Sequence, residues 1–338
     1  MPQYIPVTRF VNRFLRQPFN PIATFISLYT LTFSKTSLIY PTMSRFRAIL
    51  SPLFTSLTFA GSFVAAKYAI AALDPIAITF YRYLVALLFL TSLMLWQKLP
   101  WRGGLTRLDF LKLFLMGLTG IVGYHYFFFL SLRYTAVAHS AIINGFSPVV
   151  TGLLAAIFIK EKLTLKNYLG VIIAISGVMI LITDGNLQIL FTLGFNKGDL
   201  LMLCAVFCWG IYAVIARRLL EKHPSLTVTF YSAFSGVLIL TVLTVGDNPV
   251  PDIAALSPVV LLSILYMGLI ASGIGYYLYN ISIRQIGPTR TSSFVNSVVP
   301  VAVSILAFLF FQEPLRPIMG LSILLIIIGL RLMLRHSD

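Results

Sequence analysis

The sequence predicts an all-α integral membrane protein whose ten transmembrane helices form two inverted repeats of five helices each. Its composition, the spacing of its apolar segments and an internal duplication support this fold class. Of the 338 residues, 58% are hydrophobic and only 10% are charged, and the mean hydropathy is +0.92. Because soluble domains contain about 25% charged residues, this composition excludes a soluble protein.

Apolar segments long enough to cross a bilayer, roughly 20 residues, follow one another along the chain. The connections between them are short and contain most of the Pro, Gly and charged residues. The ten predicted spans are residues 49–70, 75–96, 110–132, 136–159, 165–183, 198–219, 226–245, 259–283, 288–311 and 317–334.

Residues 1–43 form an N-terminal extension with basic residues and many Ser and Thr. The segment before Met43 contains no Asp or Glu, as in organelle transit peptides. The alternative, which we favour, is that Met43 is the true start of the protein. Beyond this extension we expect a first repeat over 49–183, a linker over 184–197 and a second repeat over 198–334.

The duplication is clearest in four residues that recur at one fixed separation. Asn, Pro, Glu and Gly occur at 144, 148, 161 and 177, and again at 296, 300, 313 and 329, each 152 residues later. Phe59 matches Trp209 at an offset of 150, and Tyr124 matches Tyr276 at 152. With five spans per repeat, the second copy enters the membrane upside down relative to the first.

The basic residues predict the orientation. Of 25 Lys and Arg, 20 fall on the side of the N-terminus, four on the other side, and Arg82 lies within a span. The positive-inside rule therefore places both termini in the cytoplasm, and we expect a multi-pass protein of the cell (inner) membrane. The same rule explains the net charge of +15, so we expect no nucleic-acid partner.

Pro148 and Pro300 lie near the middle of the fourth and ninth spans. A proline there leaves the carbonyl four residues earlier without its N–H donor. The freed carbonyls belong to Asn144 and Asn296, whose amides add further polar groups that must be satisfied at this depth. We expect the two prolines to act as gating bends and the two asparagines to contact substrate. A static kink capped by the asparagine is the alternative.

Arg82 lies about 10 Å into the second span, at 1.5 Å per residue. A charge at this depth usually faces a cavity or a partner, and we expect Arg82 to bind a carboxylate or phosphate of the substrate. Snorkelling, or pairing with Asp74 or Glu313, is the alternative. All ten acids map to loops or span ends, which favours exchange or facilitated transport. Proton coupling through His125 or His139 stays open.

Several aromatic side chains are further candidates for a substrate cavity, with ordinary packing as the alternative. They are Tyr81, Tyr124, Trp209, Tyr212 and Tyr276. Glu313, which stands near Arg316, is expected to form an ion pair that sets a connection.

Over residues 49–334 the chain resembles the drug/metabolite transporter (DMT) superfamily, EamA type. The resemblance rests on the duplicated halves, on Lys67, Pro75 and Arg82, and on the repeated Pro-x12-Glu pattern. Phe59, Ala60 and Ser322 depart from it, where the family often has Trp, Gly and Gly. The resemblance implies export or exchange of small metabolites, often amino acids or amphipathic compounds, through a central cavity, and it implies no cofactor.

We therefore expect a secondary transporter, an exporter or exchanger of amino acids or related carboxylated compounds, that works by alternating access between the repeats. A non-transporting scaffold or sensor of the same fold is the alternative. An enzyme is not expected, because the spans contain no paired nucleophile and base and no metal-ligand cluster. The expected partners are a small-molecule substrate and the lipid bilayer, and a monomer is expected, with no catalytic residues, metal or cofactor.

Overall fold

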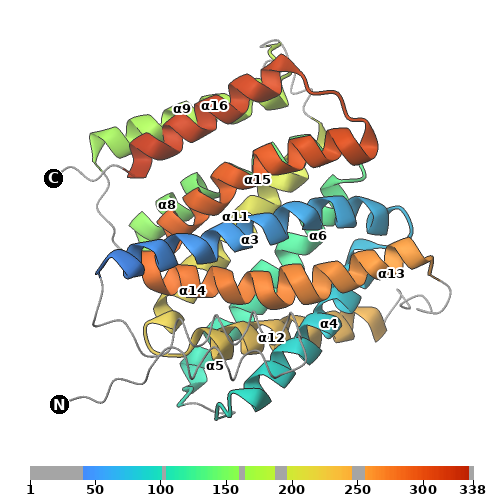
Figure 1. Cartoon of the computed structure of the whole chain (residues 1–338), viewed down its shortest axis with the longest axis vertical. Coiled ribbons are helices and arrows are strands. Elements are labelled where there is room, and N and C mark those ends of the chain that lie inside the picture. The colour runs from blue at the N-terminus through green and yellow to red at the C-terminus, as the bar shows by residue number, and fades with distance from the viewer. Residues whose placement is uncertain (1–40, 101–103, 160–163, 187–195, 246–255, 335–338) are drawn as a thin grey trace, which may run out of the picture. The chain divides into compact units, whose positions relative to one another are not determined.

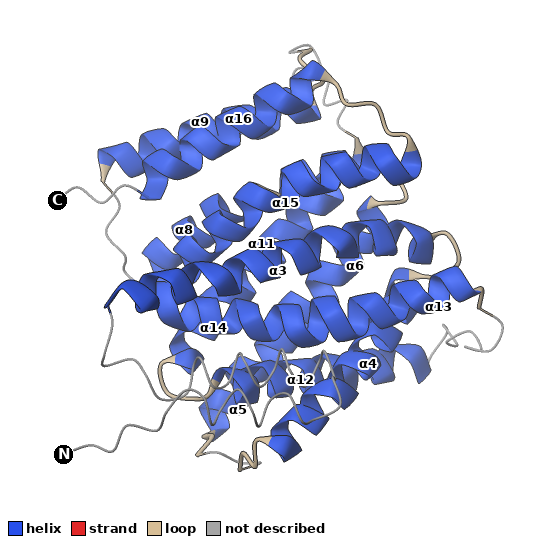
Figure 2. Cartoon of the chain, in the orientation of Figure 1, coloured by secondary structure: helices blue, strands red, loops and turns tan. Residues whose placement is uncertain are grey.

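The computed structural model describes residues 41–100, 104–159, 164–186, 196–245 and 256–334. All regular structure in these ranges is helical (Figure 2), as the composition predicts. Chain contacts separate residues 1–47 from a compact unit over 48–338, and the description below concerns that unit. Nearly all of the N-terminal extension and most of the 184–197 linker lie outside the described residues.

The first predicted repeat contains five helical segments, two of them subdivided (Figure 1). They are α3 (Pro41–Ile70), α4 (Pro75–Trp96), α5 (Arg107–Met116) continuing through the π-helix η1 (Gly117–Gly123) into α6 (Tyr124–Ser131), α7 (Val137–Asn144) followed by α8 (Ser147–Phe158), and α9 (Leu165–Ile182).

The second predicted repeat follows the same order. Its elements are α11 (Lys197–Leu220), α12 (Ser225–Val245), α13 (Pro258–Leu265) continuing through the π-helix η3 (Tyr266–Gly275) into α14 (Tyr276–Ile286), α15 (Pro288–Phe311) and α16 (Pro317–Leu334).

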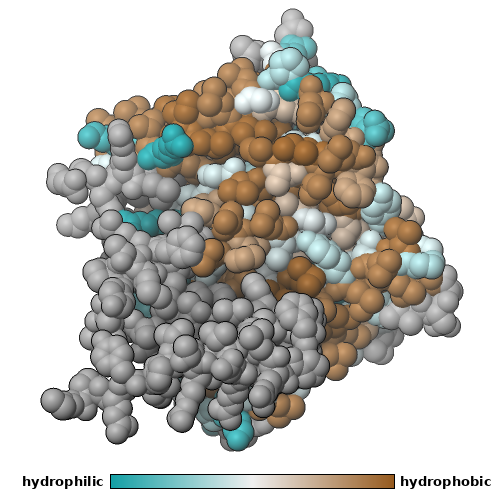
Figure 3. Space-filling model, viewed as in Figure 1, coloured by the Kyte–Doolittle hydropathy of each residue, from teal (hydrophilic) through white to brown (hydrophobic). Residues whose placement is uncertain are grey.

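Eight of these segments are long and apolar enough to cross a membrane, and two further apolar helices, Leu169–Leu181 and Pro317–Leu332, are shorter. Large apolar side chains stand exposed along the helices, among them Leu88, Ile172 and Leu324. The space-filling view is hydrophobic over much of α15 and α16 (Figure 3). The chain is therefore a multi-pass integral membrane protein. That it has ten transmembrane helices stays a prediction.

Helices of the two halves pack against each other rather than within separate bundles. α11 contacts α6 and α8, α4 contacts α12 and η3, and α15 contacts α7 and α8. α9 and α16 lie side by side (Figure 1). Their contact depends on the duplicated glycines: a Cβ at Gly329 would lie 2.5 Å from the Gly170 carbonyl oxygen, and one at Gly177 2.9 Å from that of Ser322.

The π-helices η1 and η3 interrupt corresponding segments of the two halves, which the sequence did not predict. Gly123 at the end of η1 packs against Cys208, and Gly275 at the end of η3 packs against Thr58. Thr58 and Cys208 are themselves 150 residues apart, so the two contacts are equivalent in the repeats. Short π segments within α-helices are frequent at functional sites, and here they precede Tyr124 and Tyr276.

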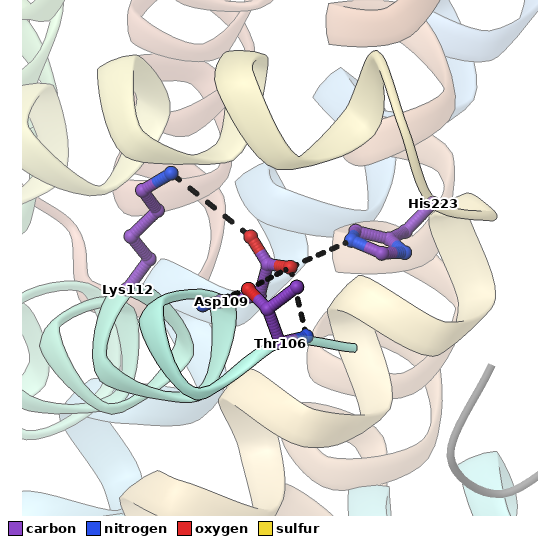
Figure 4. Close-up of polar contacts among 4 residues, drawn as sticks. All are labelled: Thr106, Asp109, Lys112 and His223. Carbon is purple, nitrogen blue, oxygen red and sulfur yellow. Dashed lines mark hydrogen bonds and ion pairs between the residues drawn. The ribbon is translucent and has the colours of Figure 1, made fainter. Parts of the chain in front are cut away.

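A buried polar cluster joins α5 to the connection between α11 and α12 (Figure 4). Asp109 forms a capping box with Thr106, whose backbone N–H and hydroxyl donate to Asp109 Oδ2 at 3.0 and 2.7 Å. His223 Nε2 lies 3.3 Å from the same oxygen, and Lys112 Nζ lies 4.0 Å from Oδ1. Because Asp109 and His223 are each 5% exposed, the cluster fixes these elements together away from water.

We expect Asp109→Ala to lower the free energy of unfolding by about 1–3 kcal/mol, because it removes the carboxylate half of the capping box and the hydrogen-bond partner of the buried His223 Nε2. Thermal unfolding in detergent micelles measures the change. Asp74→Ala is the control: its ion pair with Arg133, at 2.8 Å, is solvent-exposed and contributes little. An equal loss in both variants would contradict a special role for the cluster.

Candidate functional site

A small cavity lies between the two halves of the protein. Its lining comes from α3, α4, α6, α7, α11 and α14 and consists of Phe59, Ser62, Phe63, Arg82, Tyr124, His125, Phe128, Asn144, Trp209 and Tyr276. The space open to the centre of a water molecule is about 20 Å³, which holds roughly one or two waters. An organic solute therefore fits only if the surrounding helices move apart.

Arg82 is buried in this cavity and is 2% exposed. Its Nε donates to Ser272 Oγ at 2.5 Å, which links α4 to η3. Among the described residues, no carboxylate oxygen lies within 4.0 Å of the guanidinium. Asp74 pairs instead with Arg133, so neither snorkelling nor that ion pair accounts for Arg82. A buried cation without a counter-ion is costly, and it is a strong attractor for an anionic ligand.

His125 presents a hydrogen-bond acceptor to the same cavity. Its Nδ1 lies 2.9 Å from the carbonyl oxygen of Ile121, and because a carbonyl only accepts, Nδ1 carries the proton. In the neutral imidazole, Nε2 is then an acceptor. This atom is buried and has no hydrogen-bond partner among the described residues. The cavity thus combines a strong donor at Arg82 with an unused acceptor at His125.

The aromatic side chains of the cavity lining form a box, and the polar atoms of Trp209 and Tyr276 form hydrogen bonds with other residues of the protein. Trp209 Nε1 donates to Tyr279 Oη at 3.0 Å, and Tyr276 Oη donates to the carbonyl of Gly120 at 3.2 Å. The Trp209 and Tyr276 rings meet edge-on, with centroids 5.2 Å apart. With these polar groups satisfied, the box offers ring surfaces for apolar or cationic parts of a ligand.

Two predicted aromatic residues do not line the cavity. Tyr212 is fully buried behind Trp209, stacked on its ring at 5.3 Å, and its hydroxyl accepts from Asn280 Nδ2. Tyr81 is half-buried on α4 beside Phe80. Their predicted substrate contacts remain proposals, and in this structure Tyr212 supports the box from behind.

The two repeated asparagines contact each other. Asn144 Nδ2 donates to Asn296 Oδ1 at 3.0 Å. Asn144 is 7% exposed and lines the cavity, whereas Asn296 is 3% exposed behind it and donates to the Ser292 carbonyl. The hydrogen bond joins the halves of the protein at the edge of the cavity.

The two repeated prolines lie in unequal helices. The helix breaks between Asn144 and Ser147, and the carbonyl freed by Pro148 accepts from Ser147 Oγ at 2.7 Å. Pro300, by contrast, lies inside the continuous helix α15. Gly145, in the break, allows α15 to approach closely. A Cβ at Gly145 would lie 3.1 Å from Pro300 Cγ and 2.8 Å from the Ile142 carbonyl oxygen. The break and the second proline therefore form one junction.

Glu313 does not form the expected ion pair with Arg316, which bonds to Asp184 at 2.7 Å. The Glu313 carboxylate instead accepts from the backbone N–H groups of Val137 and Ala138, at 2.9 and 3.0 Å. It thus caps the N-terminus of α7 from the other half of the chain. A carboxylate is favoured there because the first N–H groups of a helix have no internal acceptor.

Sequence reasoning missed four lining residues and the partner of Arg82. Phe59 could have been found, because it is the repeat equivalent of Trp209. Ser62 lies one turn beyond it on α3, whereas Phe63 and Phe128 carry no distinguishing signal among 27 Phe. Ser272 was hidden by the π-helix, which changes the direction of side chains along η3.

The fold and the cavity define a multi-pass membrane protein with an internal site between two similar halves. The model of the EamA-like transporter family matches residues 46–183 and again residues 196–335. The chain therefore belongs to the EamA-like transporter family, within the drug/metabolite transporter superfamily, and is a membrane transporter rather than an enzyme. The family expected from the residue pattern is confirmed.

Similar proteins support this assignment. The uncharacterized transporter YyaM of Bacillus subtilis (strain 168) is 29% identical over 277 residues, covering 82% of this chain and 88% of its own. A WAT1-related protein of Arabidopsis thaliana is 25% identical over 300 residues, covering 80% of each chain. One crystal structure superposes with a TM-score of 0.62 at 18% identity, covering 84% of this chain and 95% of the other, which supports the fold.

We expect Asn144→Ala and Asn296→Ala to be energetically coupled, because each removes the same hydrogen bond between the halves. A double-mutant cycle of equilibrium unfolding in mixed micelles should give a coupling free energy of about 1 kcal/mol. Asp109→Ala combined with Asn296→Ala is the control cycle, for which we expect a coupling near zero. Additive effects of the two asparagine substitutions would show that their contact is energetically neutral.

Proposed function

We propose that the protein is a secondary transporter, an exporter or exchanger, of small carboxylated metabolites, with amino acids as the first candidates. The observation that carries this proposal is the buried guanidinium of Arg82, which lines the central cavity and lies near no carboxylate of the described chain. A substrate carboxylate supplies the missing charge through a charge-assisted hydrogen bond.

The other lining groups favour an amino acid over a simple carboxylate. In the proposed complex, the α-carboxylate binds Arg82 while His125 Nε2 accepts from the α-ammonium group. The rings of Phe59, Trp209 and Tyr276 surround the side chain and contribute cation–π and apolar contacts. The carboxylate, the ammonium group and the side chain of the substrate are then each bound by a group of complementary chemistry.

The proposed mechanism is alternating access by two inverted repeats of five spans, with α9 and α16 as the fifth span of each. In such transporters the substrate lies at the repeat interface near mid-membrane, and one repeat rocks against the other. The Asn144–Asn296 hydrogen bond and the Gly145–Pro300 contact lie at this interface. We propose Pro148 and Pro300 as the bends around which α7, α8 and α15 move.

Exchange or facilitated transport fits the lining better than proton coupling through a carboxylate. No lining residue of the cavity is Asp or Glu, and the buried Asp109 and Asp199 stand in the first turns of α5 and α11. His125 is the one titratable imidazole in the lining, so a dependence of flux on a pH gradient would assign coupling to it. In keeping with the distribution of basic residues, we propose both termini in the cytoplasm.

Arg82→Ala should lower the rate of counter-exchange at least about 10-fold, because losing a hydrogen bond to a charged group costs about 1.5–3 kcal/mol. The assay uses proteoliposomes preloaded with unlabelled amino acids, organic acids or phosphorylated metabolites, with the labelled counterpart outside. Arg133→Ala, which breaks an exposed ion pair, is the matched control and should exchange normally. Absence of flux for the whole panel would favour a sensor or scaffold instead.

Glu313→Gln should loosen the end of the helix bundle at which α7 begins, because an amide replaces the charged cap of that helix. We expect a cysteine placed at Ser62, in a variant with Cys204 and Cys208 replaced by alanine, to react roughly 10-fold faster with an impermeant thiol reagent. Asp184→Asn, which breaks an exposed ion pair at the same end, is the control. Unchanged labelling in Glu313→Gln would mean that Glu313 does not hold this end shut.

A further inference from the structure

The guanidinium of Arg82 has one bound end and one free end. Its Nε donates to Ser272 Oγ at 2.5 Å, whereas its two terminal nitrogens have no hydrogen-bond or ion-pair partner among the described residues. The Tyr83 ring, 5.9 Å from Cζ, makes a cation–π contact that uses no N–H donor. Because Arg82 lines the central cavity, the terminal nitrogens are the donors left for a ligand.

The bond between Arg82 and Ser272 depends on a close approach of η3 to α4. A Cβ at Gly268 would lie 2.7 Å from the Arg82 carbonyl oxygen and 2.6 Å from Val85 Cβ, so this spacing requires glycine. Gly268 and Ser272 are four residues apart in η3, about one helical turn, and both meet α4. The π-helix thus brings the serine hydroxyl to the guanidinium.

The other half of the protein has an equivalent close approach but no cation. A Cβ at Gly117 of η1 would lie 3.0 Å from the Ser232 carbonyl oxygen of α12. Ser232 stands 150 residues after Arg82, directly after the repeated Thr-Phe-Tyr sequence, and its hydroxyl donates to its own helix. The residue 152 positions before Ser272 is Gly120, which has no side chain to hold a charged group. The duplication therefore keeps the positive charge on one side of the cavity.

The described lining of the central cavity contains a single Lys or Arg, which is Arg82. The other basic side chain there, His125, presents its Nε2 lone pair and so repels an anion. A second carboxylate of a substrate, or the second charge of a phosphate, would be buried without a counter-ion. Burying an unpaired charge is costly, and the lining therefore favours substrates with one negative group.

We propose that Ser272 is a positioning residue, which holds Arg82 by its Nε so that the site binds one carboxylate end-on through the two terminal nitrogens. A guanidinium binds a carboxylate bidentately through both terminal nitrogens, or through Nε and one of them. Ser272 occupies Nε and leaves the first arrangement. The substrates are then monocarboxylates, above all amino acids with an uncharged side chain, rather than dicarboxylates or phosphorylated metabolites. The inference rests on the proposed function of the central cavity and narrows it.

The first test compares substrates that differ in charge. Counter-exchange into proteoliposomes that contain the full-length protein is measured for glutamine, leucine, glutamate and succinate, each against itself. Glutamine and glutamate are the matched pair, because they have the same shape and differ by one charge. We expect saturable exchange of a neutral amino acid, with a KM at least about 10-fold below those of glutamate and succinate. A KM for glutamate or succinate as low as that of glutamine and leucine would overturn the proposal.

The second test removes the serine hydroxyl. Ser272→Ala should raise the KM of the exchanged neutral amino acid roughly 10-fold, because Arg82 loses the bond that orients it. The maximal rate should stay near that of the parent. Ser282→Ala is the control: it removes a buried hydroxyl that donates to its own helix, at the Leu278 carbonyl, and should exchange like the parent.

A variant of unchanged volume separates positioning from packing. Ser272→Cys keeps the size of the side chain but replaces the oxygen by a weak acceptor, so it should raise the KM as Ser272→Ala does. Loss of packing in η3 would instead lower the maximal rate, or the melting temperature, in Ser272→Ala alone. A parental KM in either variant would overturn the positioning role.

The same assay distinguishes this inference from the proposed function. Exchange that is lost in Arg82→Ala but has a parental KM in Ser272→Ala supports the central anion site and overturns only the role of Ser272. Normal exchange in Arg82→Ala overturns the central anion site and the role of Ser272 together. Absence of exchange for all four compounds in the parent protein does the same.

Discussion

The buried guanidinium of Arg82 is the constraint on which the centre of the protein depends. The Arg82 side chain is 2% exposed, donates a hydrogen bond to Ser272 Oγ and has no nearby carboxylate in the described chain, so surrounding dipoles must stabilise its charge. The small volume of the cavity, about 20 Å³, leaves little room for water to solvate the charge. In the proposed transport cycle the missing counter-ion has a role, because a permanent one would occupy the place proposed for the substrate.

The polar groups around Arg82 divide into two sets. Trp209, Tyr276 and Tyr212 use their polar atoms in hydrogen bonds with other residues of the protein, so the box keeps its shape without a ligand. His125 Nε2 has no such partner. A rigid apolar wall with few unsatisfied polar groups is the usual composition of a ligand site. Specificity is therefore expected to reside in Arg82 and His125, and affinity for the carbon skeleton in the rings.

The sequence predicted what depends on chemistry at fixed spacing, and it missed what depends on helix geometry. The 152-residue repeat identified Asn144 and Asn296, which form a hydrogen bond, and the cost of burying charge identified Arg82. The π-helices η1 and η3 have no compositional signal, and they determine where Ser272, Tyr124 and Tyr276 stand. The predicted ion pair between Glu313 and Arg316 was wrong. Glu313 binds the N-terminus of α7 instead, and only the tertiary structure brings that helix end close to it.

The two halves have related sequences but differ locally at equivalent positions. The fourth segment breaks at Asn144, whereas α15 continues through Pro300, and Asn144 lines the cavity, whereas Asn296 lies behind it. In a duplicated protein such differences cannot come from the shared motif. They are expected if each half can adopt either local form and the proposed transport cycle exchanges them.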